Sequence, residues 1–244
     1  MKKLLAIALA FCAGVAAHAD DGDEGGVEAS RKGAAAKAEL KKLLKEGVKT
    51  EENGDVVITG LPPVTTMNID KVREVGYVFF RLLIYVDPDL DVEKLGESID
   101  KAAGNRRTPG GGMYIKDIMS GIDKYFARRN LNLQKINFSG TAPRQKIDDG
   151  LPILCWISSN GDYEGHYVNR LEKRGEAKDM ASWSKELRKL EKKNKKGNSY
   201  MKALCIGYNK ATGEYLFNGL AKEDIWMTEK EAKDAMLEAY VLRF

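Results

Sequence analysis

The chain has 244 residues, of which 43% are hydrophobic and 31% are charged, a composition typical of a folded globular protein. The formal net charge of +4 is too small to indicate an anionic partner for the protein as a whole. Three cysteines and two histidines are too few for a disulfide scaffold or a zinc site, and the sequence predicts no metal and no cofactor.

The first 19 residues have the pattern of a secretory signal peptide. Lys2 and Lys3 precede an apolar run from Leu4 to about Val15, and Ala17-His18-Ala19 is a cleavage site of the small-x-small type. The run is shorter than the roughly 20 apolar residues that span a bilayer. We therefore expect a secreted or periplasmic bacterial protein cleaved near Ala19. Cleavage removes two basic and no acidic residues, so the net charge falls from +4 to +2.

The next segment, residues 20–60, is predicted to be a leader. Its acidic, glycine-rich start (DDGDEGG) is typical of a flexible segment, and its alanine- and lysine-rich part predicts a helix from Ser30 to about Glu46, ended by Gly47. A turn and a short strand follow from Asn53. Leu61-Pro62-Pro63 then interrupts regular structure, and we place the start of the main domain, residues 61–244, at this point.

The first half of this domain is predicted to be mainly helical. The segment from Val75 to Val86 is apolar except for Arg81, and its β-branched and aromatic content favours a buried strand, although periodicity does not exclude a helix. Amphipathic helices are expected over 91–104 and 113–129, joined by a glycine-rich loop.

The second half has the pattern of an antiparallel sheet. Two predicted strands are followed by a long charged helix or helix pair, a hairpin with a five-residue turn, a helix that begins with a Thr-x-x-Glu capping box, and a last strand. These elements cover, in order, 132–138, 151–158, 170–196, 199–219, 228–237 and 238–244. The fold class is therefore α+β, with a helical half followed by an antiparallel sheet that carries a charged helical insertion.

Three stretches of this half, IDDGLPILCWIS, KALCIGYNKATGEYLFNG and DIWMTEKEA, resemble the papain-like cysteine peptidases of the bacteriocin-leader-processing type. The resemblance rests on a strand of the form G-x-P-I-L and a strand that ends in G-Y-N. In the first half, VREVGYVFFRLLIYV looks like the family's helix that carries the nucleophile. The resemblance covers about Pro63 to Phe244 and implies a papain-like fold.

Catalysis in that family needs a thiolate, an imidazole, a residue that orients the imidazole, and a glutamine beside the oxyanion. The resemblance places these four roles at Val78, Met201, Asn218 and Val72 respectively. An isopropyl group cannot attack a carbonyl, and a thioether carries no proton at neutral pH. The resemblance therefore implies a domain that keeps the fold and lacks the catalytic groups.

Three other residues could supply displaced catalytic groups. His166 is the only histidine that remains after cleavage, and Cys155 and Cys205 are the remaining thiols. Both cysteines lie in apolar strand patterns, which favours buried, inert side chains. A cross-strand disulfide between them remains possible if their strands are neighbours. We accordingly expect a catalytically inactive homologue that acts by binding. The alternative is an active thiol hydrolase that uses these displaced residues.

Two features could bind a partner. The aromatic residues Tyr77, Trp156, Tyr200 and Trp226 could line a groove that holds a peptide or protein, or they could belong to the core. The segment from Arg170 to Lys196 has eleven basic and five acidic residues and could either be a solvated helix face or contact an anionic surface. Because aromatic residues are nearly absent from it, it does not indicate nucleic-acid binding.

Overall fold

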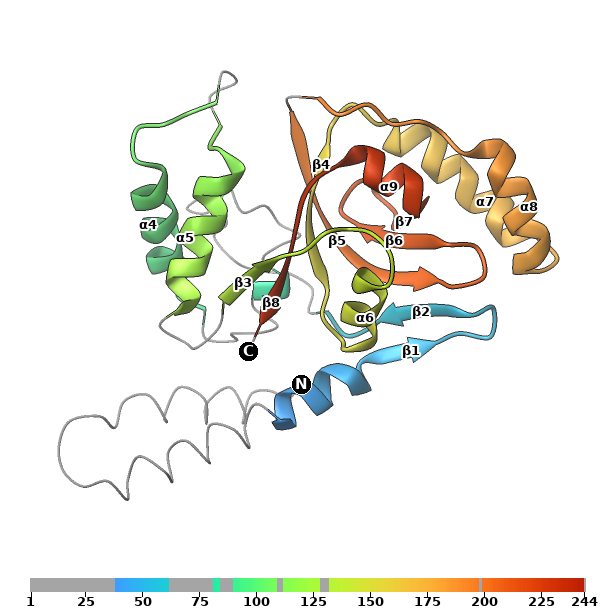
Figure 1. Ribbon diagram of the computed structural model, residues 1–244, viewed down its shortest axis with the longest axis horizontal. Helices are drawn as coiled ribbons and strands as arrows, with labels where there is room; N and C mark the ends of the chain where they lie inside the picture. Colours follow the sequence, from blue (N-terminus) through green and yellow to red (C-terminus); the bar gives the residue numbers. More distant parts are fainter. Residues whose placement is uncertain are drawn as a thin grey trace.

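The computed structural model describes residues 38–61, 81–83, 90–108, 112–127, 132–197 and 199–243 (Figure 1). The predicted signal peptide, the acidic start of the leader and the positions of Val72, Tyr77 and Val78 lie outside the described residues. Within the described residues, no helix is both long enough and apolar enough to cross a membrane.

The described chain begins with a helix over 38–46, as predicted, followed by Gly47. A hairpin comes next, formed by β1 (Val48–Thr50) and β2 (Asp55–Ile58). β2 pairs with β5 (Tyr200–Asn209), so that Asp55 lies opposite Asn209. The second part of the predicted leader therefore forms two strands of the sheet.

A pair of helices covers one face of the sheet. α4 (Val92–Ala103) begins at Asp91, whose side chain accepts a hydrogen bond from the backbone N–H of Lys94, and α5 is Ile115–Ala127. The two helices touch at Gly121, because a Cβ there would lie only 2.4 Å from the Cα of Ile99. Residues 81–83 are also helical, so the preference for a strand in this apolar segment is wrong there. β-propensity depends on the packing around a residue and does not fix the conformation of a short apolar run.

The sheet is antiparallel in every described pairing and has the order β1-β2-β5-β4-β8-β3, with β6 beside β5 and β7 beside β6. The ranges not yet given are β3 (Asn132–Lys135), β4 (Ile153–Ser158), β6 (Glu214–Asn218), β7 (Ile225–Thr228) and β8 (Met236–Arg243). The α+β class is confirmed at this level.

Three helical pieces join these strands. α6 (Ala142–Asp148) precedes β4, and α9 (Glu229–Ala235) joins β7 to β8. Between β4 and β5 the chain forms η2, a π-helical turn (Tyr163–Tyr167), then α7 (Val168–Glu176), α8 (Met180–Leu190) and an irregular stretch up to β5. We call residues 163–197 the helical arm.

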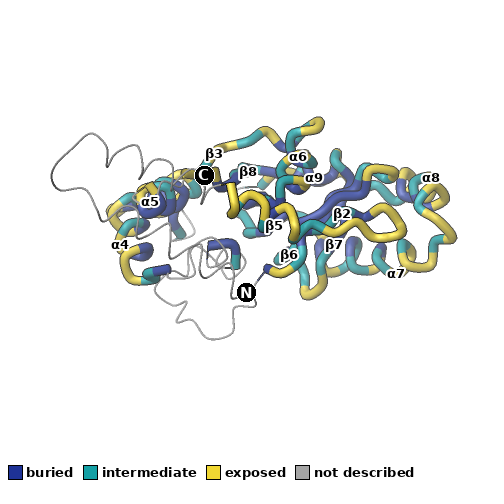
Figure 2. The backbone as a smooth tube through the Cα atoms, turned by 90° about the horizontal axis from the view of Figure 1, so that it is seen from below, coloured by how far each residue is buried: buried dark blue, intermediate teal, exposed yellow. Residues whose placement is uncertain are grey.

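Alternating side chains of the sheet belong to two separate cores. Trp156 and Leu204 contribute to the core under α4 and α5, whereas Cys155 and Cys205 contribute to a second core with residues of η2, α6 and α9. The strands are accordingly among the most buried parts of the chain, while much of α7 and α8 is exposed (Figure 2).

Candidate functional site

Both cysteines lie in the second core and face the same side of the sheet. β4 and β5 are neighbours, with Ile153 opposite Cys205 and Cys155 opposite Ala203. The two thiols are nevertheless free and fully buried. Cys155 donates to the carbonyl of Ile153 over 3.4 Å. The cross-strand disulfide that the sequence left open is therefore not formed.

Burial also makes both thiols unreactive. Loss of solvent raises the pKa of Cys155 far above its ordinary value, although the backbone N–H of Cys205 partly opposes the shift. The pKa of Cys205 is raised by burial first and by the neighbouring Cys155 second. Because the thiolate is the nucleophile, a thiol that stays protonated at neutral pH cannot attack a carbonyl at a useful rate.

His166 lies on η2, with its ring edge-on to Tyr167 at 5.0 Å between the centroids. Its Nε2 is buried and has no hydrogen-bond partner among the described residues. Burial lowers the pKa of His166, and the positive charges of Arg170 and Lys192 lower it further, against the opposing effects of Glu231 and Asp162. No hydrogen bond joins this ring to either thiol in the described part of the chain, so the displaced catalytic pair is not assembled there.

Trp156 and Tyr200 come together on the face of the sheet that packs against α4 and α5. Their rings meet edge to face at 4.8 Å, and the indole N–H of Trp156 points at the sulfur of Met119 over 3.3 Å. The Tyr200 hydroxyl donates to the carbonyl of Met113 over 2.9 Å. Trp156 is fully buried and Tyr200 half-buried, so both side chains help to join the sheet to the helices.

Met201 faces the other way. It pairs with Ile157 and packs against the second core, on the opposite side of β5 from Tyr200. Asn218 lies at the end of β6, where its oxygen accepts a hydrogen bond from Arg81 over 3.1 Å and its amide donates to Asp224. The two family positions that the structure describes are therefore not on one common surface of the strand pair.

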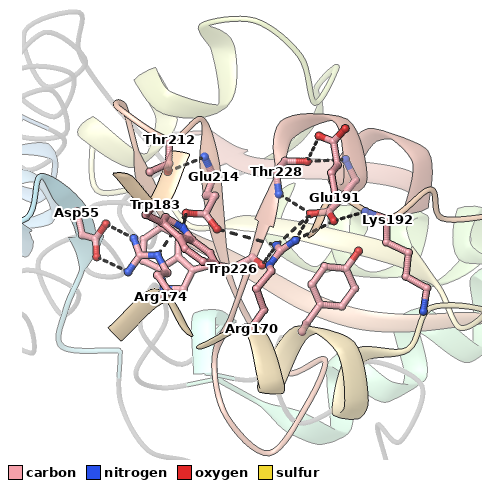
Figure 3. Close-up of polar contacts among 12 residues, drawn as sticks. Asp55, Arg170, Arg174, Trp183, Glu191, Lys192, Thr212, Glu214, Trp226 and Thr228 are labelled. Carbon is pink, nitrogen blue, oxygen red and sulfur yellow. Dashed lines mark hydrogen bonds and ion pairs between the residues drawn. The ribbon is translucent and has the colours of Figure 1, made fainter. Parts of the chain in front are cut away.

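Trp226 belongs to a different arrangement, a buried cluster of charged residues that the sequence analysis did not find. Its ring stacks on the guanidinium of Arg174 at 4.0 Å. We call Asp55, Arg170, Arg174, Glu214 and Glu231 the ionic cluster (Figure 3). The three acids and Arg170 are at most 3% exposed, and only Arg174 reaches the edge of solvent.

One half of the ionic cluster is centred on Glu231, at the start of α9. Arg170 donates through Nη1 to both oxygens of Glu231, over 2.8 and 3.0 Å, and through Nη2 to the carbonyl of Trp226. The same carboxylate accepts the backbone N–H groups of Thr228 and Lys192, each over 2.8 Å. Thr228 and Glu231 form the predicted capping box, which is confirmed.

The other half is centred on Arg174, which lies one helical turn after Arg170 and so on the same face of α7. Arg174 donates through both terminal nitrogens to Asp55 and through Nε to Glu214 over 3.2 Å. Glu214 also accepts the indole N–H of Trp183 over 2.9 Å, while its other oxygen lies 3.9 Å from Arg170. The helical arm is thereby bound to β2, β6 and α9.

This arrangement has the chemistry of a structural joint. It contains neither a thiol nor an imidazole, and its carboxylates accept hydrogen bonds from guanidinium, indole, amide and backbone donors. The exception is Oε1 of Glu214, which has no hydrogen-bond partner among the described residues and lies 3.9 Å from Arg170. Among the described residues, no group of three metal-binding side chains could hold a metal ion. A search of protein-family models, of curated proteins and of solved structures found no match to the chain.

Proposed function

We propose that the chain is an exported, papain-like domain that catalyses no reaction and acts by binding a peptide or protein. The observation that carries this proposal is the position of the two thiols that remain after signal cleavage. Both lie in the second core, and His166 lies on η2 beside charged groups, with no hydrogen bond to either thiol within the described residues. Since the sequence has valine and methionine where the resemblance expects a thiol and an imidazole, neither the family positions nor the fallback residues supply a catalytic pair.

The papain-like part of the proposal is supported by the contact between the helical half and the sheet. Leu154 and Trp156 of β4 and Leu204 of β5 pack under α4 and α5, and Asn218 and Arg81 connect the end of β6 to the helical residues 81–83. Tyr200 faces the helices at the position next to Met201 and has its hydroxyl bound to a backbone carbonyl.

The helical arm is the part of the chain that we propose contacts an anionic surface. Two of its eleven basic residues, Arg170 and Arg174, are neutralised inside the ionic cluster, and the nine others are all exposed. Six acidic residues lie in the helical arm, so an excess of positive charge remains on its outside. Lipid head groups, cell-wall polymers and acidic proteins are the anionic partners that an exported protein would meet.

Alkylation of the folded protein tests the proposal. The mature chain, residues 20–244, is treated with iodoacetamide at pH 7.5 with and without 8 M urea, and labelling is followed by mass spectrometry. We expect labelling of Cys155 and Cys205 only in urea, together with no cleavage of a mixed fluorogenic peptide library. Rapid labelling of either cysteine in the folded protein, abolished by its replacement with alanine, would instead support an active thiol hydrolase.

A further inference from the structure

A hollow of about 540 Å³ opens on the surface where the helical arm returns to the sheet. Its walls come from the connection between β3 and α6, from α9, from the start of β8 and from the end of the helical arm. Phe138, Met236 and Ala239 form a buried apolar floor. Three lysines from three different segments, Lys135, Lys196 and Lys233, stand around it.

The charge in this hollow is unbalanced. Lys135 pairs with Glu238, the one carboxylate of its wall, over 3.3 Å, and Lys233 pairs with Glu229 one turn earlier on α9 over 2.7 Å. Lys196 is exposed and makes no ion pair within the described residues. The hollow therefore presents more positive than negative charge, with Lys196 ready to accept an anionic group.

The backbone that carries Lys196 is held in place. In Figure 1 this stretch passes over α9 on its way from α8 to β5. The side chain of Asn194 is buried and donates to the Tyr167 hydroxyl over 2.8 Å and to the carbonyl of Glu231 over 3.1 Å. On the other side of Lys196, Gly197 donates to the Ser158 hydroxyl over 2.9 Å. A lysine between two such anchors loses little backbone entropy when a ligand binds.

We propose that this hollow binds an acidic peptide segment that carries one large apolar side chain. A carboxylate would pair with Lys196, next to the Lys233–Glu229 ion pair, and the apolar side chain would lie on Phe138 and Met236. The volume falls within the range of about 300–1,000 Å³ that ligand sites occupy. An apolar floor and a glutamate in the wall suit a peptide better than a uniformly charged phosphate polymer. This inference rests on the proposed binding function and gives it a place and a partner.

The test uses a fluorescein-labelled peptide with the core Asp-Glu-Phe-Asp-Glu between Gly-Ser flanks, titrated with the mature protein and read by anisotropy. The variant K196E places a carboxylate in the hollow. Its matched control, K193E, changes the net charge equally at an exposed lysine of the same stretch that does not line the hollow. We expect K196E to weaken binding about ten-fold and K193E less than about two-fold, since each lost or repelled surface pair changes affinity only severalfold.

Three results would overturn the inference: no binding of the acidic peptide, equal weakening by K196E and K193E, or equal binding of a peptide with serine in place of phenylalanine. Displacement of the peptide by polyphosphate at equal charge concentration would show that a phosphate polymer is the better ligand and would overturn it as well. If K196E lowers the urea midpoint of unfolding, the variant K196Q is used instead, and we expect it to weaken peptide binding about three-fold. If the peptide does not bind as expected, the result of the alkylation experiment is unaffected. Rapid alkylation of a cysteine in the folded protein would instead refute the proposal that the domain acts by binding without catalysis.

Discussion

Replacing Glu231 by glutamine should remove a large part of the stability of the fold. Glu231 is fully buried, and each of its oxygens accepts more than one hydrogen bond. Oε1 receives Arg170 Nη1 and the backbone N–H of Lys192, and Oε2 receives both terminal nitrogens of Arg170 and the backbone N–H of Thr228. Whichever oxygen E231Q replaces, the new NH₂ group would face N–H donors and leave Arg170 with only the more distant carboxylate of Glu214, 3.9 Å away.

The magnitude follows from the cost of an uncompensated buried charge. Removing one partner of a buried ion pair typically costs about 3–5 kcal/mol, and a buried backbone N–H left without an acceptor costs about 1–3 kcal/mol. Glutamine keeps one acceptor oxygen, so we expect E231Q to lower the free energy of unfolding by about 3–5 kcal/mol in total. Because a domain of this kind has about 5–15 kcal/mol to lose, the variant should unfold well below the wild-type temperature.

Urea denaturation of residues 20–244, followed by tryptophan fluorescence and far-UV circular dichroism, measures this loss. E223Q is the matched control, because Glu223 is exposed and makes no ion pair within the described residues; we expect it to change stability by less than about 0.5 kcal/mol. A loss below about 1 kcal/mol for E231Q would refute the reasoning, since it would mean that Arg170 finds another partner or water at no cost.

Three further predictions concern other buried groups. Burial raises the pKa values of Cys155 and Cys205, so these thiols stay protonated in the folded chain and ionise on unfolding. Stability should be nearly constant with pH below about 8 and fall by about 3 kcal/mol between about pH 8.5 and pH 10, where the unfolded thiols ionise. The C155A/C205A double variant should lose this dependence in urea titrations. Burial lowers the pKa of His166, so its contribution to stability is present above the ordinary histidine pKa and is lost as the pH falls. An NMR titration of the folded protein should find a midpoint for His166 below that of the urea-unfolded chain. A midpoint at or above that of the unfolded chain would contradict the packing described for η2. G121A should destabilise the helix pair by about 1–3 kcal/mol, because its Cβ would overlap the backbone of Ile99; wild-type thermal stability of this variant would show that α4 and α5 can separate freely.

The elements that the sequence predicted correctly are those with a signal inside one short stretch. Thr228 and Glu231 lie three residues apart, and this pair alone predicts the start of a helix. The turn from Asn209 to Gly213 separates two apolar runs, which predicts a hairpin. The amphipathic pattern of α4 and α5 is also local. Two thiols in apolar strand patterns indicated burial, and the structure confirms it.

Two of the elements that the sequence analysis missed, α6 and β7, have weak local signals. α6 has only seven residues and has Pro143 in its first turn. Proline is accepted at the start of a helix but is also common in loops, so the sequence pattern does not distinguish the two. β7 has four residues, all buried, and alternation cannot appear in so short a run. Both are stabilised by tertiary packing against the second core, to which Ile147 and Met227 contribute.

The ionic cluster was missed for a different reason, which is the distance along the chain between its members. Arg170 and Arg174 look like any two cations of a charged helix, and nothing near them in sequence marks them as buried. Asp55 lies 119 residues before Arg174, and Glu231 lies 61 residues after Arg170. Only the fold brings them together, and the spacing of four residues between the two arginines was the sole hint that they share a face.

One carboxylate of the ionic cluster also holds the stretch that leads to the proposed peptide site, which links stability to binding. Glu231 accepts the backbone N–H of Lys192, and its own carbonyl accepts the side chain of Asn194, so α9 fixes the stretch that presents Lys196. E231Q should therefore weaken binding of the acidic peptide at temperatures where the variant is still folded, although it leaves every residue lining the hollow unchanged. C155A, which removes a buried sulfur atom from β4, should lower stability without this loss of affinity. Equal peptide affinities for wild-type protein and folded E231Q would mean that Lys196 is held by Ser158 and Gly197 alone.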